Sequence, residues 1–432
     1  MDILFIHQNF PGQYKHLAPR LAQMGHRCVA LTLRVKKPVT WKGVRVLPYT
    51  MPRRAGQQLH PWLVDLDTKL TRGHACFAAA RGLREMGFRP ALILAHPGWG
   101  ESMFLRDVWP EARLGIYCEL YHLAEYPHVG FDPEFPCPDP ATEPLRIRIK
   151  NLNNHLHFPV ATAGISPTRF QADTFPDTFR DRITVCHDGI DTALARPDAE
   201  ARFALAEAGG NAGEDAHGGA KGGGSLSRAD EVITFINRNL EPYRGYHVFM
   251  RALPQLLRAR PAAQVVILGG DEVSYGAPPS AGRTWKQIFI DEVRGQIADA
   301  DWARVHFCGR IPYERYLRLL QVSRVHVYLT YPFVLSWSLL EAMSSQAAIV
   351  ASDTAPVREV IRDGETGRLV DFFDREALIA RICELLEDAP QRHALGAAAR
   401  RHIVAHYDLE TICLPRQLDW VRGLLEAPPP AG

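Results

Sequence analysis

Short apolar runs alternate with longer segments of helical periodicity along most of the chain. Residues 3–7 and 28–33 are such runs, and between them Leu17, Leu21 and Met24 recur at the spacing of one helix face. Strands separated by helical segments predict right-handed crossovers and parallel sheets. The same pattern predicts further strands at residues 44–47, 91–95, 114–118, 161–166 and 183–187.

A stretch of low apolar content interrupts this alternation between residues 201 and 230. Glycine-rich runs at residues 209–213 and 218–224 leave few side chains to bury, so packing would not repay the entropy of ordering the stretch. We therefore expect a flexible insertion near a domain junction.

The alternation resumes after this stretch. Strands are predicted at residues 232–236, 265–269, 305–308, 325–329, 348–352 and 368–370, and helices at residues 246–258, 375–406 and 409–425. The whole pattern is typical of two consecutive doubly wound units.

The predicted fold is therefore α/β, with two doubly wound, Rossmann-like domains. The predicted parts are a first domain over residues 1–195, a flexible glycine-rich linker over 196–230, a second domain over 231–405, and over 406–432 a helix that packs back toward the first domain and a frayed tail. Doubly wound sheets bind ligands at the carboxyl ends of their strands. We expect the two domains to face a cleft, with functional residues just after strands.

The length and amino-acid composition are those of a globular protein with two α/β domains. A length of 432 residues suits two α/β domains, and 46% hydrophobic and 23% charged residues are ordinary values for a globular protein. The formal net charge of +2 gives no general attraction to nucleic acid, and no nucleic-acid partner is predicted. Residues 34–54 carry basic side chains and no acidic one, which predicts either a face for an anionic acceptor or lipid surface, or a solvated loop.

The cysteines and the start of the chain bear on location. None of the eight cysteines forms a C-x-x-C pair, which leaves a zinc or redox motif unsupported and suits a reducing compartment. The chain enters a strand at once, without a basic leader, and no apolar run approaches the ~20 residues that span a bilayer. We expect a cytoplasmic protein, with peripheral attachment at the inner membrane as a further option.

Three residues near strand ends are candidates in the first domain. Gly12 lies where the first strand meets a helix, a junction that exposes backbone N–H groups to phosphate or an acceptor, or forms a plain tight turn. His96 ends the strand at 91–95, and Glu119 follows the strand at 114–118. Each of these two side chains is either a polar group at the sugar or acceptor, or a satisfied strand-end residue.

The second domain opens with two arginines six residues apart. Arg238 and Arg244 leave a buried strand and bracket the start of the next helix. Guanidinium groups bind diphosphates in a bidentate manner, so this pair predicts a diphosphate clamp.

A second candidate segment follows the strand at 325–329. Leu335, Ser336 and Trp337 lie at the start of a helix, whose free N–H groups can bind phosphate. Glu341 lies about one turn into this apolar helix and needs a partner. A ribose diol supplies two hydrogen-bond donors, and a structural salt bridge is the alternative.

Taken in order, these blocks resemble the donor site of glycosyltransferase family 4. The resemblance covers nearly the whole chain and rests on an ordered set of blocks, each weak alone: Arg238 with Arg244-Gly245, and residues 266–270, 307–312, 339–343 and 351–370. It implies the GT-B fold, a nucleotide-activated sugar donor, retention of anomeric configuration and no catalytic metal. It also implies that the first domain takes the acceptor and the second the donor.

The resemblance assigns roles by position. Arg238 and Arg244 match an Arg/Lys pair on the donor diphosphate, and Glu341 matches the second glutamate of an E-x7-E motif, which binds ribose. The other matched positions flank the base or approach the donor phosphate: Gly309, Arg310, Ile311 and Gly12.

Three positions depart from the family pattern. Arg244 stands where lysine is usual, Phe333 stands where the first glutamate of E-x7-E would fall, and Glu119 followed by His122 stands where many members have a histidine. Phenylalanine accepts no hydrogen bond from a sugar. The hypothesis is that sugar recognition has moved to backbone N–H groups near Leu335 and Ser336.

The predicted function is a retaining transfer of a hexose-like sugar from a UDP- or GDP-sugar to a hydroxyl of a glycan or lipid-linked acceptor. Catalysis would rest on Arg238, Arg244 and a helix start that stabilise the departing diphosphate, with His96 and Glu119 at the sugar or acceptor. No cofactor or metal is expected, because no D-x-D motif follows a strand. The alternatives are a non-catalytic nucleotide-sugar-binding protein, which the loss of glutamate at Phe333 favours, and a GT-B epimerase or phosphorylase.

Overall fold

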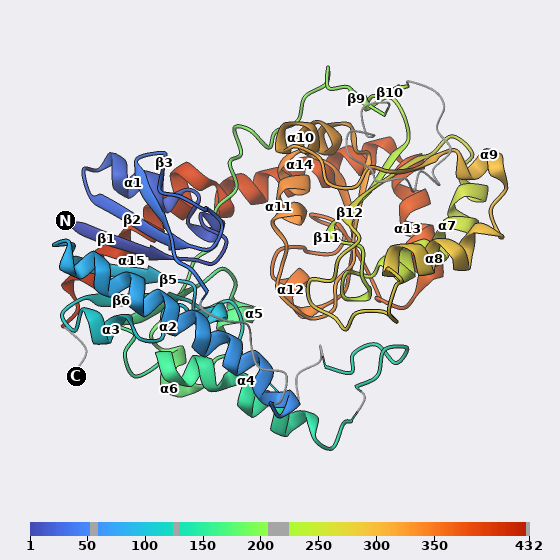
Figure 1. Cartoon of the computed structure of the whole chain (residues 1–432). Helices are drawn as coiled ribbons and strands as arrows, with labels where there is room; N and C mark the ends of the chain where they lie inside the picture. The colour runs from blue at the N-terminus through green and yellow to red at the C-terminus, as the bar shows by residue number, and fades with distance from the viewer. Residues whose placement is uncertain (52–58, 124–128, 138, 206–223, 429–432) are drawn as a thin grey trace. The chain divides into compact units, whose positions relative to one another are not determined.

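A computed structural model describes residues 1–51, 59–123, 129–137, 139–205 and 224–428 (Figure 1). The chain divides into two compact units, one of Met1–Gly189 with Leu409–Gly432 and the other of Ile190–Asp408. Both are mainly parallel sheets with helices, which confirms the predicted α/β class. Among the described residues, no helix is long and apolar enough to cross a membrane.

The first unit contains an eight-stranded sheet. Its order is β3-β4-β2-β1-β5-β6-β7-β8, and every neighbouring pair is parallel except β3 with β4. The strands are β1 Asp2–Ile6, β2 Arg27–Thr32, β3 Val39–Trp41, β4 Val44–Pro48, β5 Pro90–Ala95, β6 Arg113–Tyr117, β7 Ala163–Ser166 and β8 Ile183–Val185. The carboxyl ends of β1 and β5 are adjacent, so His7 and His96, which follow them, lie at the same sheet edge.

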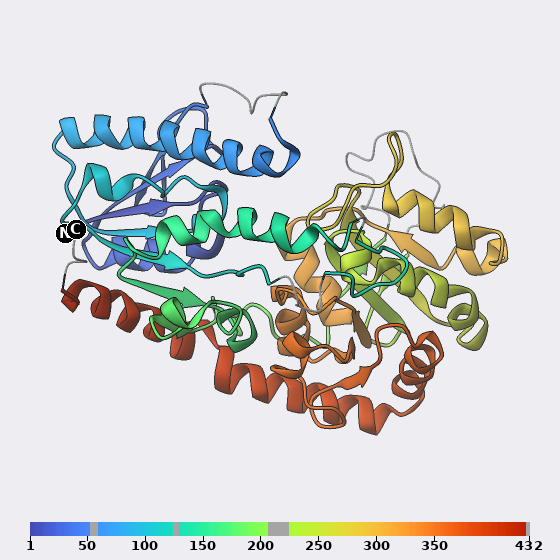
Figure 2. The same cartoon turned by 90° about the horizontal axis from the view of Figure 1, so that it is seen from below.

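Helices cover both faces of this sheet (Figure 2). Leu4 and Ile6 of β1 pack with α2 on one face, whereas Ile3 and Phe5 pack with α1 and α15 on the other. Because both faces are buried, the strand is a continuous apolar run rather than an alternating one. The helices are α1 Leu17–Gln23, α2 Val64–Glu85, α3 Leu105–Val108, α4 Glu143–His157, α5 Arg169–Ala172, α6 Asp177–Arg180 and α15 Leu414–Glu426, with short turns η1 Gly12–Tyr14, η2 Pro61–Leu63, η3 Pro97–Trp99 and η6 Leu409–Cys413.

The second unit contains a six-stranded, all-parallel sheet of order β13-β12-β11-β14-β15-β16. Its strands are β11 Val232–Asn239, β12 Gln264–Gly270, β13 Val305–Phe307, β14 Val325–Tyr328, β15 Ala348–Ser352 and β16 Arg368–Val370. The strand order reverses between β11 and β14, and such a switch point is where doubly wound sheets bind ligands. Arg238 lies at the end of β11 and Arg244 in the loop after it, and the loop after β14 leads into the helix start that the sequence singled out.

Helices also cover the second sheet. Phe235 of β11 stacks on Phe249 of α7 with ring centroids 4.5 Å apart, while Ile236 belongs to the apolar cluster of the opposite face, with Leu339 and Leu340 of α11. The helices are α7 Tyr246–Ala259, α8 Trp285–Arg294, α9 Asp299–Trp302, α10 Tyr313–Val322, α11 Trp337–Ser344, α12 Ala355–Arg358, α13 Arg375–Glu387 and α14 Ala389–Tyr407, and η5 Pro242–Arg244 precedes α7.

The segment predicted as a flexible linker has packed ends. Short strands β9 Phe203–Ala204 and β10 Ser225–Leu226 pair in antiparallel fashion, and the side chains of Phe203 and Leu226 join the core of the second unit. These apolar residues supply the burial that the glycine runs lack, so the prediction was too broad at both ends. Its glycine-rich centre, residues 206–223, lies outside the described residues.

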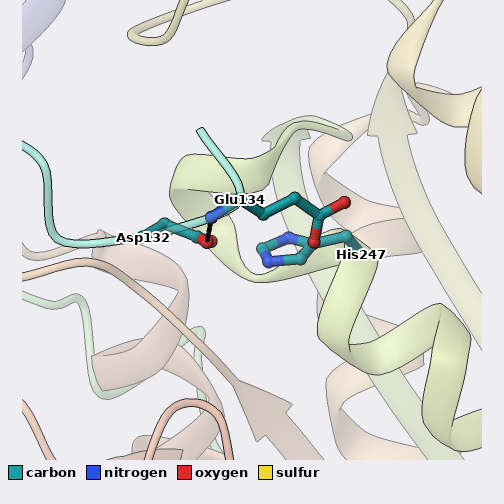
Figure 3. Close-up of side chains that lie close together, drawn as sticks. All are labelled: Asp132, Glu134 and His247. Atoms are coloured by element: carbon teal, nitrogen blue, oxygen red, sulfur yellow. Dashed lines mark hydrogen bonds between the residues drawn. The ribbon is translucent and has the colours of Figure 1, made fainter. Parts of the chain in front are cut away.

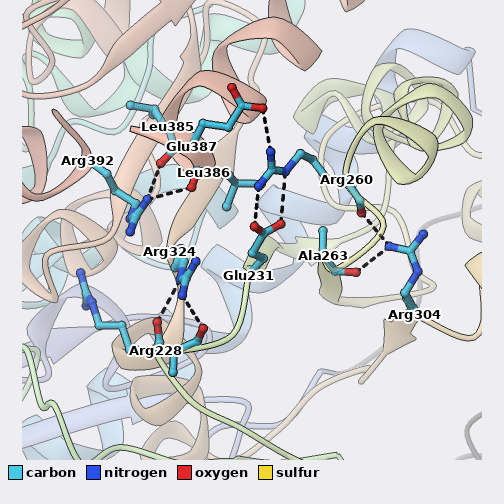
Figure 4. Close-up of polar contacts among 11 residues, drawn as sticks. Arg228, Glu231, Arg260, Ala263, Arg304, Arg324, Leu385, Leu386, Glu387 and Arg392 are labelled. Carbon is cyan, nitrogen blue, oxygen red and sulfur yellow. Dashed lines mark hydrogen bonds and ion pairs between the residues drawn. The ribbon is translucent and has the colours of Figure 1, made fainter. Parts of the chain in front are cut away.

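Arginines close the carboxyl-terminal ends of several second-unit helices (Figure 4). Arg392 donates hydrogen bonds to the carbonyls of Leu385 and Leu386 at the end of α13, at 2.7 and 3.1 Å. Arg304 donates to the carbonyls of Arg260 and Ala263 after α7, both at 2.9 Å. Cations satisfy the orphan carbonyls at helix ends, so this cluster has a structural role.

Candidate functional site

Arg244 is built into the switch point of the second unit. It ends η5, and Gly245 follows with φ +66°, where a Cβ atom would lie 2.3 Å from the Leu329 side chain. The buried Arg244 guanidinium donates through Nη1 to Thr330 Oγ1 at 2.8 Å and to the carbonyl of Val334 at 2.9 Å. It therefore ties the loop after β11 to the loop after β14.

The electrostatics of Arg244 favour a permanent charge. Burial opposes the charged form, but the neighbouring Tyr328 and Tyr275 hold the pKa of Arg244 above its ordinary value. The Arg244 guanidinium lies 5.1 Å from the ring centroid of Tyr275, and its Nη1 also donates to the Tyr328 hydroxyl at 3.2 Å. Arg238, near the end of β11, is by contrast exposed. The two arginines of the predicted clamp thus have different environments, one internal and one at the surface.

The segment after β12 is held by a buried carboxylate. Glu241 is 1% exposed, and it accepts hydrogen bonds from the backbone N–H groups of Ser274 at 3.1 Å and of Tyr275 and Gly276 at 3.2 Å each. Successive N–H groups that converge on one anion form a nest. Glu241 therefore fixes Tyr275 beside Arg244. Glu241 was not among the predicted site residues, although an acid directly before Pro242 in this block was a visible signal.

Phe333 packs within an aromatic cluster. Its ring is 8% exposed and lies edge-on to the rings of Tyr243 and Tyr275, with centroids 5.6 and 4.9 Å away. The residue in place of the first E-x7-E glutamate thus supports the loops around Arg244. It offers no polar atom to a sugar.

The start of α11 is partly occupied by internal contacts. The Ser336 N–H donates to the Tyr328 hydroxyl at 2.9 Å, and Ser336 Oγ accepts from the Ser338 N–H at 3.3 Å. The Ser336 N–H was expected to be available for phosphate or sugar, and it is instead engaged. Leu335 lies beside it and packs against the core, and Trp337 begins the helix.

Glu341 lies in α11 and faces two tyrosines of α10. Its carboxylate accepts a hydrogen bond from the Tyr313 hydroxyl at Oε1, at 2.7 Å, and from the Tyr316 hydroxyl at Oε2, at 2.6 Å. A salt bridge was the alternative expected for Glu341, and these two contacts are instead hydrogen bonds from tyrosine hydroxyls. Neither tyrosine was among the predicted site residues, although their spacing of three residues places them on one helix face.

The three residues predicted to flank a base lie before α10. Gly309 has φ +58°, which favours glycine, and Ile311 packs against the core of the second unit. Arg310 donates to Asn239 Oδ1 at 2.8 Å and to Glu272 Oε2 at 2.6 Å. Arg310 therefore links this turn to the ends of β11 and β12.

In the first unit, the structure brings His96 and Glu119 together. Their Nε2 and Oε2 atoms are 3.6 Å apart, and His96 Nδ1 accepts the N–H of Gly98 at 3.2 Å. Burial lowers the pKa of His96 to about 3, so the ring is neutral at physiological pH and this pair is not a salt bridge. His96 Nε2 is buried and has no hydrogen-bond partner among the described residues.

His7 packs against Gly12 beside this pair. A Cβ atom on Gly12 would lie 2.2 Å from His7 Nε2, so only glycine permits this contact. His7 Nδ1 accepts the N–H of Asn9 at 2.9 Å, which places the ring proton on Nε2, and Nε2 donates to Gln13 Oε1 at 2.7 Å. The rings of His7 and His96 have centroids 5.3 Å apart. His7 was not among the predicted site residues, although it follows the first strand as His96 follows β5.

Asp132, Glu134 and His247 are drawn in Figure 3. The Glu134 N–H donates to Asp132 Oδ1 at 3.0 Å, a local turn of the first unit. His247 belongs to the first turn of α7 in the second unit and lies beside Phe289 and Phe372, with ring centroids 5.7 and 5.9 Å away. The hydrogen bond between Glu134 and Asp132 thus lies within the first unit, and the ring contacts of His247 lie within the second.

Two doubly wound domains, with a buried arginine and a carboxylate at the switch point of the second, define a protein of the GT-B class. The family model described as "Glycosyl transferase family 4 group" matches residues 24–195, and the family model described as "Glycosyl transferases group 1" matches residues 224–402. The chain belongs to glycosyltransferase family 4, as its sequence blocks predicted.

One curated relative agrees with the family assignment, and two solved structures agree with the fold. The phosphatidyl-myo-inositol mannosyltransferase of Mycolicibacterium smegmatis is 30% identical over 190 residues, which is 43% of this chain and 43% of that protein. The match thus spans less than half of that relative's length. Sucrose-phosphate synthase from Thermosynechococcus elongatus superimposes with a TM-score of 0.71 at 16% identity over 98% of both chains. Alr3699/HepE of Anabaena, solved with UDP-glucose, gives 0.65 at 16% identity, over 98% of this chain and 100% of that one.

Proposed function

We propose that the protein is a retaining glycosyltransferase that moves a hexose-like sugar from a UDP- or GDP-sugar to a hydroxyl of a glycan or lipid-linked acceptor. The observation that carries the proposal is the switch point of the second unit, where Arg244 joins two strand-end loops and Glu341 lies in the helix that follows. The nucleotide in the Alr3699/HepE complex supports a UDP-sugar, and the mannosyltransferase relative supports a lipid-linked acceptor.

In this proposal the second unit holds the donor. Glu341 accepts hydrogen bonds from the ribose, while Gly309, Arg310 and Ile311 flank the base. The exposed Arg238 reaches the diphosphate directly. Arg244 contributes a fixed positive charge and holds the loop at residues 330–334 in place, because its Nη1 atom is already committed to Thr330 and Val334. Preorganised charge stabilises a departing diphosphate without reorganisation during the reaction, so no metal or cofactor is required.

The first unit would present the acceptor side. His96 and Glu119 offer a neutral imidazole and a half-exposed carboxylate within 3.6 Å, which suits hydrogen bonding to sugar or acceptor hydroxyls. Gly12 keeps the neighbouring turn close to His7. Its backbone would approach the donor phosphate. The basic residues 34–54 would attach a cytoplasmic protein to an anionic membrane surface.

A thermal-shift screen of UDP-, GDP- and ADP-sugars tests the proposal. A ligand at 100 times its Kd adds about 2.7 kcal/mol of stability, so the correct donor should raise Tm by several degrees. A shift with UDP- or GDP-sugars supports the donor class, whereas no shift with any nucleotide contradicts the proposal.

A non-catalytic nucleotide-sugar-binding protein is the second candidate, and Phe333 favours it. A buried phenylalanine stands where the family has a sugar-binding carboxylate. Such a protein would bind the donor and release no nucleoside diphosphate.

A further inference from the structure

Both oxygens of the proposed ribose-binding carboxylate already accept phenol hydrogen bonds. Tyr313 donates to Glu341 Oε1 and Tyr316 donates to Oε2, at 2.7 and 2.6 Å. Burial, and then the nearby carboxylate, raise the pKa of each tyrosine, so both hydroxyls stay protonated and act as donors. This pair presents to Glu341 the same chemistry as a vicinal diol, which is two hydroxyl donors to one carboxylate.

The two tyrosines differ in how firmly they are held. Tyr313 is 43% exposed and is the first residue of α10, directly after Pro312. Tyr316 lies one turn further on and packs against the apolar core that includes Leu339 and Leu340 of α11. The two rings are stacked, with centroids 5.7 Å apart. Tyr313 therefore has less packing to lose by rotating into solvent than Tyr316, whose ring packs against the core.

We propose that the Tyr313 hydroxyl is a placeholder that occupies Glu341 until a donor ribose displaces it, while Tyr316 holds the carboxylate in position. This inference rests on the proposed function of Glu341 and adds a specificity-determining residue to that site. Glu341 is 7% exposed, so a nucleotide gains the Glu341 contact only after Tyr313 leaves, and its apparent affinity is its intrinsic affinity multiplied by the fraction of the protein in which Tyr313 is already displaced. Ligands without ribose hydroxyls do not displace Tyr313 and lose nothing to this competition.

Calorimetric titration of the full-length protein with UDP and GDP tests the placeholder. Tyr313→Phe keeps the ring and removes only the competing hydroxyl, so it should lower the Kd of whichever nucleotide the wild type binds by about three- to tenfold. The same variant should leave the Kd of the matching 2′,3′-dideoxynucleotide unchanged. The Tm of Tyr313→Phe should stay near that of the wild type, because the side chain is exposed.

Tyr316→Phe is the matched control, since it removes the other phenol from the same carboxylate. It should not tighten nucleotide binding, because the hydroxyl that it removes is the one that holds Glu341. Unchanged or weaker binding by Tyr313→Phe overturns the inference, and so does an equal gain for the dideoxynucleotide or for Tyr316→Phe. A wild-type protein that binds neither UDP nor GDP would instead overturn the proposed function itself.

Discussion

Replacing Glu241 with alanine removes the buried anion that fixes residues 274–276. Three backbone N–H groups, from Ser274, Tyr275 and Gly276, lose their acceptor together. A hydrogen bond to a charged group contributes about 1.5–3 kcal/mol, so three would amount to roughly 4.5–9 kcal/mol if none were replaced. The segment is partly exposed, and water can reach its N–H groups once it moves. We therefore expect a loss of about 2–4 kcal/mol in the free energy of unfolding.

The local effect is measurable without assuming two-state unfolding. Amide hydrogen exchange at residues 274–276 should accelerate by at least tenfold in Glu241→Ala, and urea denaturation should show the loss of stability. The donor KM should rise as well, since Tyr275 no longer lies beside Arg244. Glu272→Ala is the control for hydrogen exchange, because Glu272 lies in the same segment but is exposed and pairs at the surface with Arg310. Unchanged exchange at residues 274–276 in Glu241→Ala would refute the role given to this carboxylate.

Other predictions concern the arginines, metal and pH. Arg238→Ala should weaken donor binding at least tenfold with little change in Tm, whereas Arg244→Ala should lower both, because only the latter is buried and braces two loops; equal melting curves for the two variants would contradict this. Turnover should survive excess EDTA, and activity that Mg²⁺ or Mn²⁺ alone restores would refute metal independence. Burial lowers the pKa of His7, His96 and His326 to about 3 each. Between pH 3 and about 6.5 these three histidines bind more protons in the unfolded chain than in the folded one. Stability should thus be complete above pH 6.5 and decline as pH falls; a Tm independent of pH between 5 and 7 would count against neutral buried histidines.

Much of the fold followed from sequence periodicity. The strand expected at 368–370 is β16, and that at 91–95 is β5 with one residue added. The helix expected over 375–406 is two helices, α13 and α14, and the break was visible in the sequence, since Asp388 is an N-cap and Pro390 follows it. Local signals therefore predicted most of the helices and strands, but the signal for the break between α13 and α14 was overlooked.

Less of the site than of the fold could be predicted from the sequence. Arg244 was expected to face a diphosphate, and the structure shows its Nη1 bonded to Thr330 and Val334 of the loop after β14. Its partners lie 86 and 90 residues away in the chain, and the tyrosines on Glu341 lie on another helix. Such contacts depend on how helices and loops meet at the sheet edge, which no local pattern encodes.

Release of nucleoside diphosphate from a sugar nucleotide tests the central claim most directly. Purified protein would be incubated with UDP- and GDP-sugars without acceptor, and free UDP or GDP quantified by chromatography, with Glu341→Ala as the control. Slow release from at least one donor, reduced at least tenfold in Glu341→Ala, is the predicted result. Binding of a sugar nucleotide with no release, with or without glycan and lipid acceptors, would contradict transferase activity and favour a binding protein.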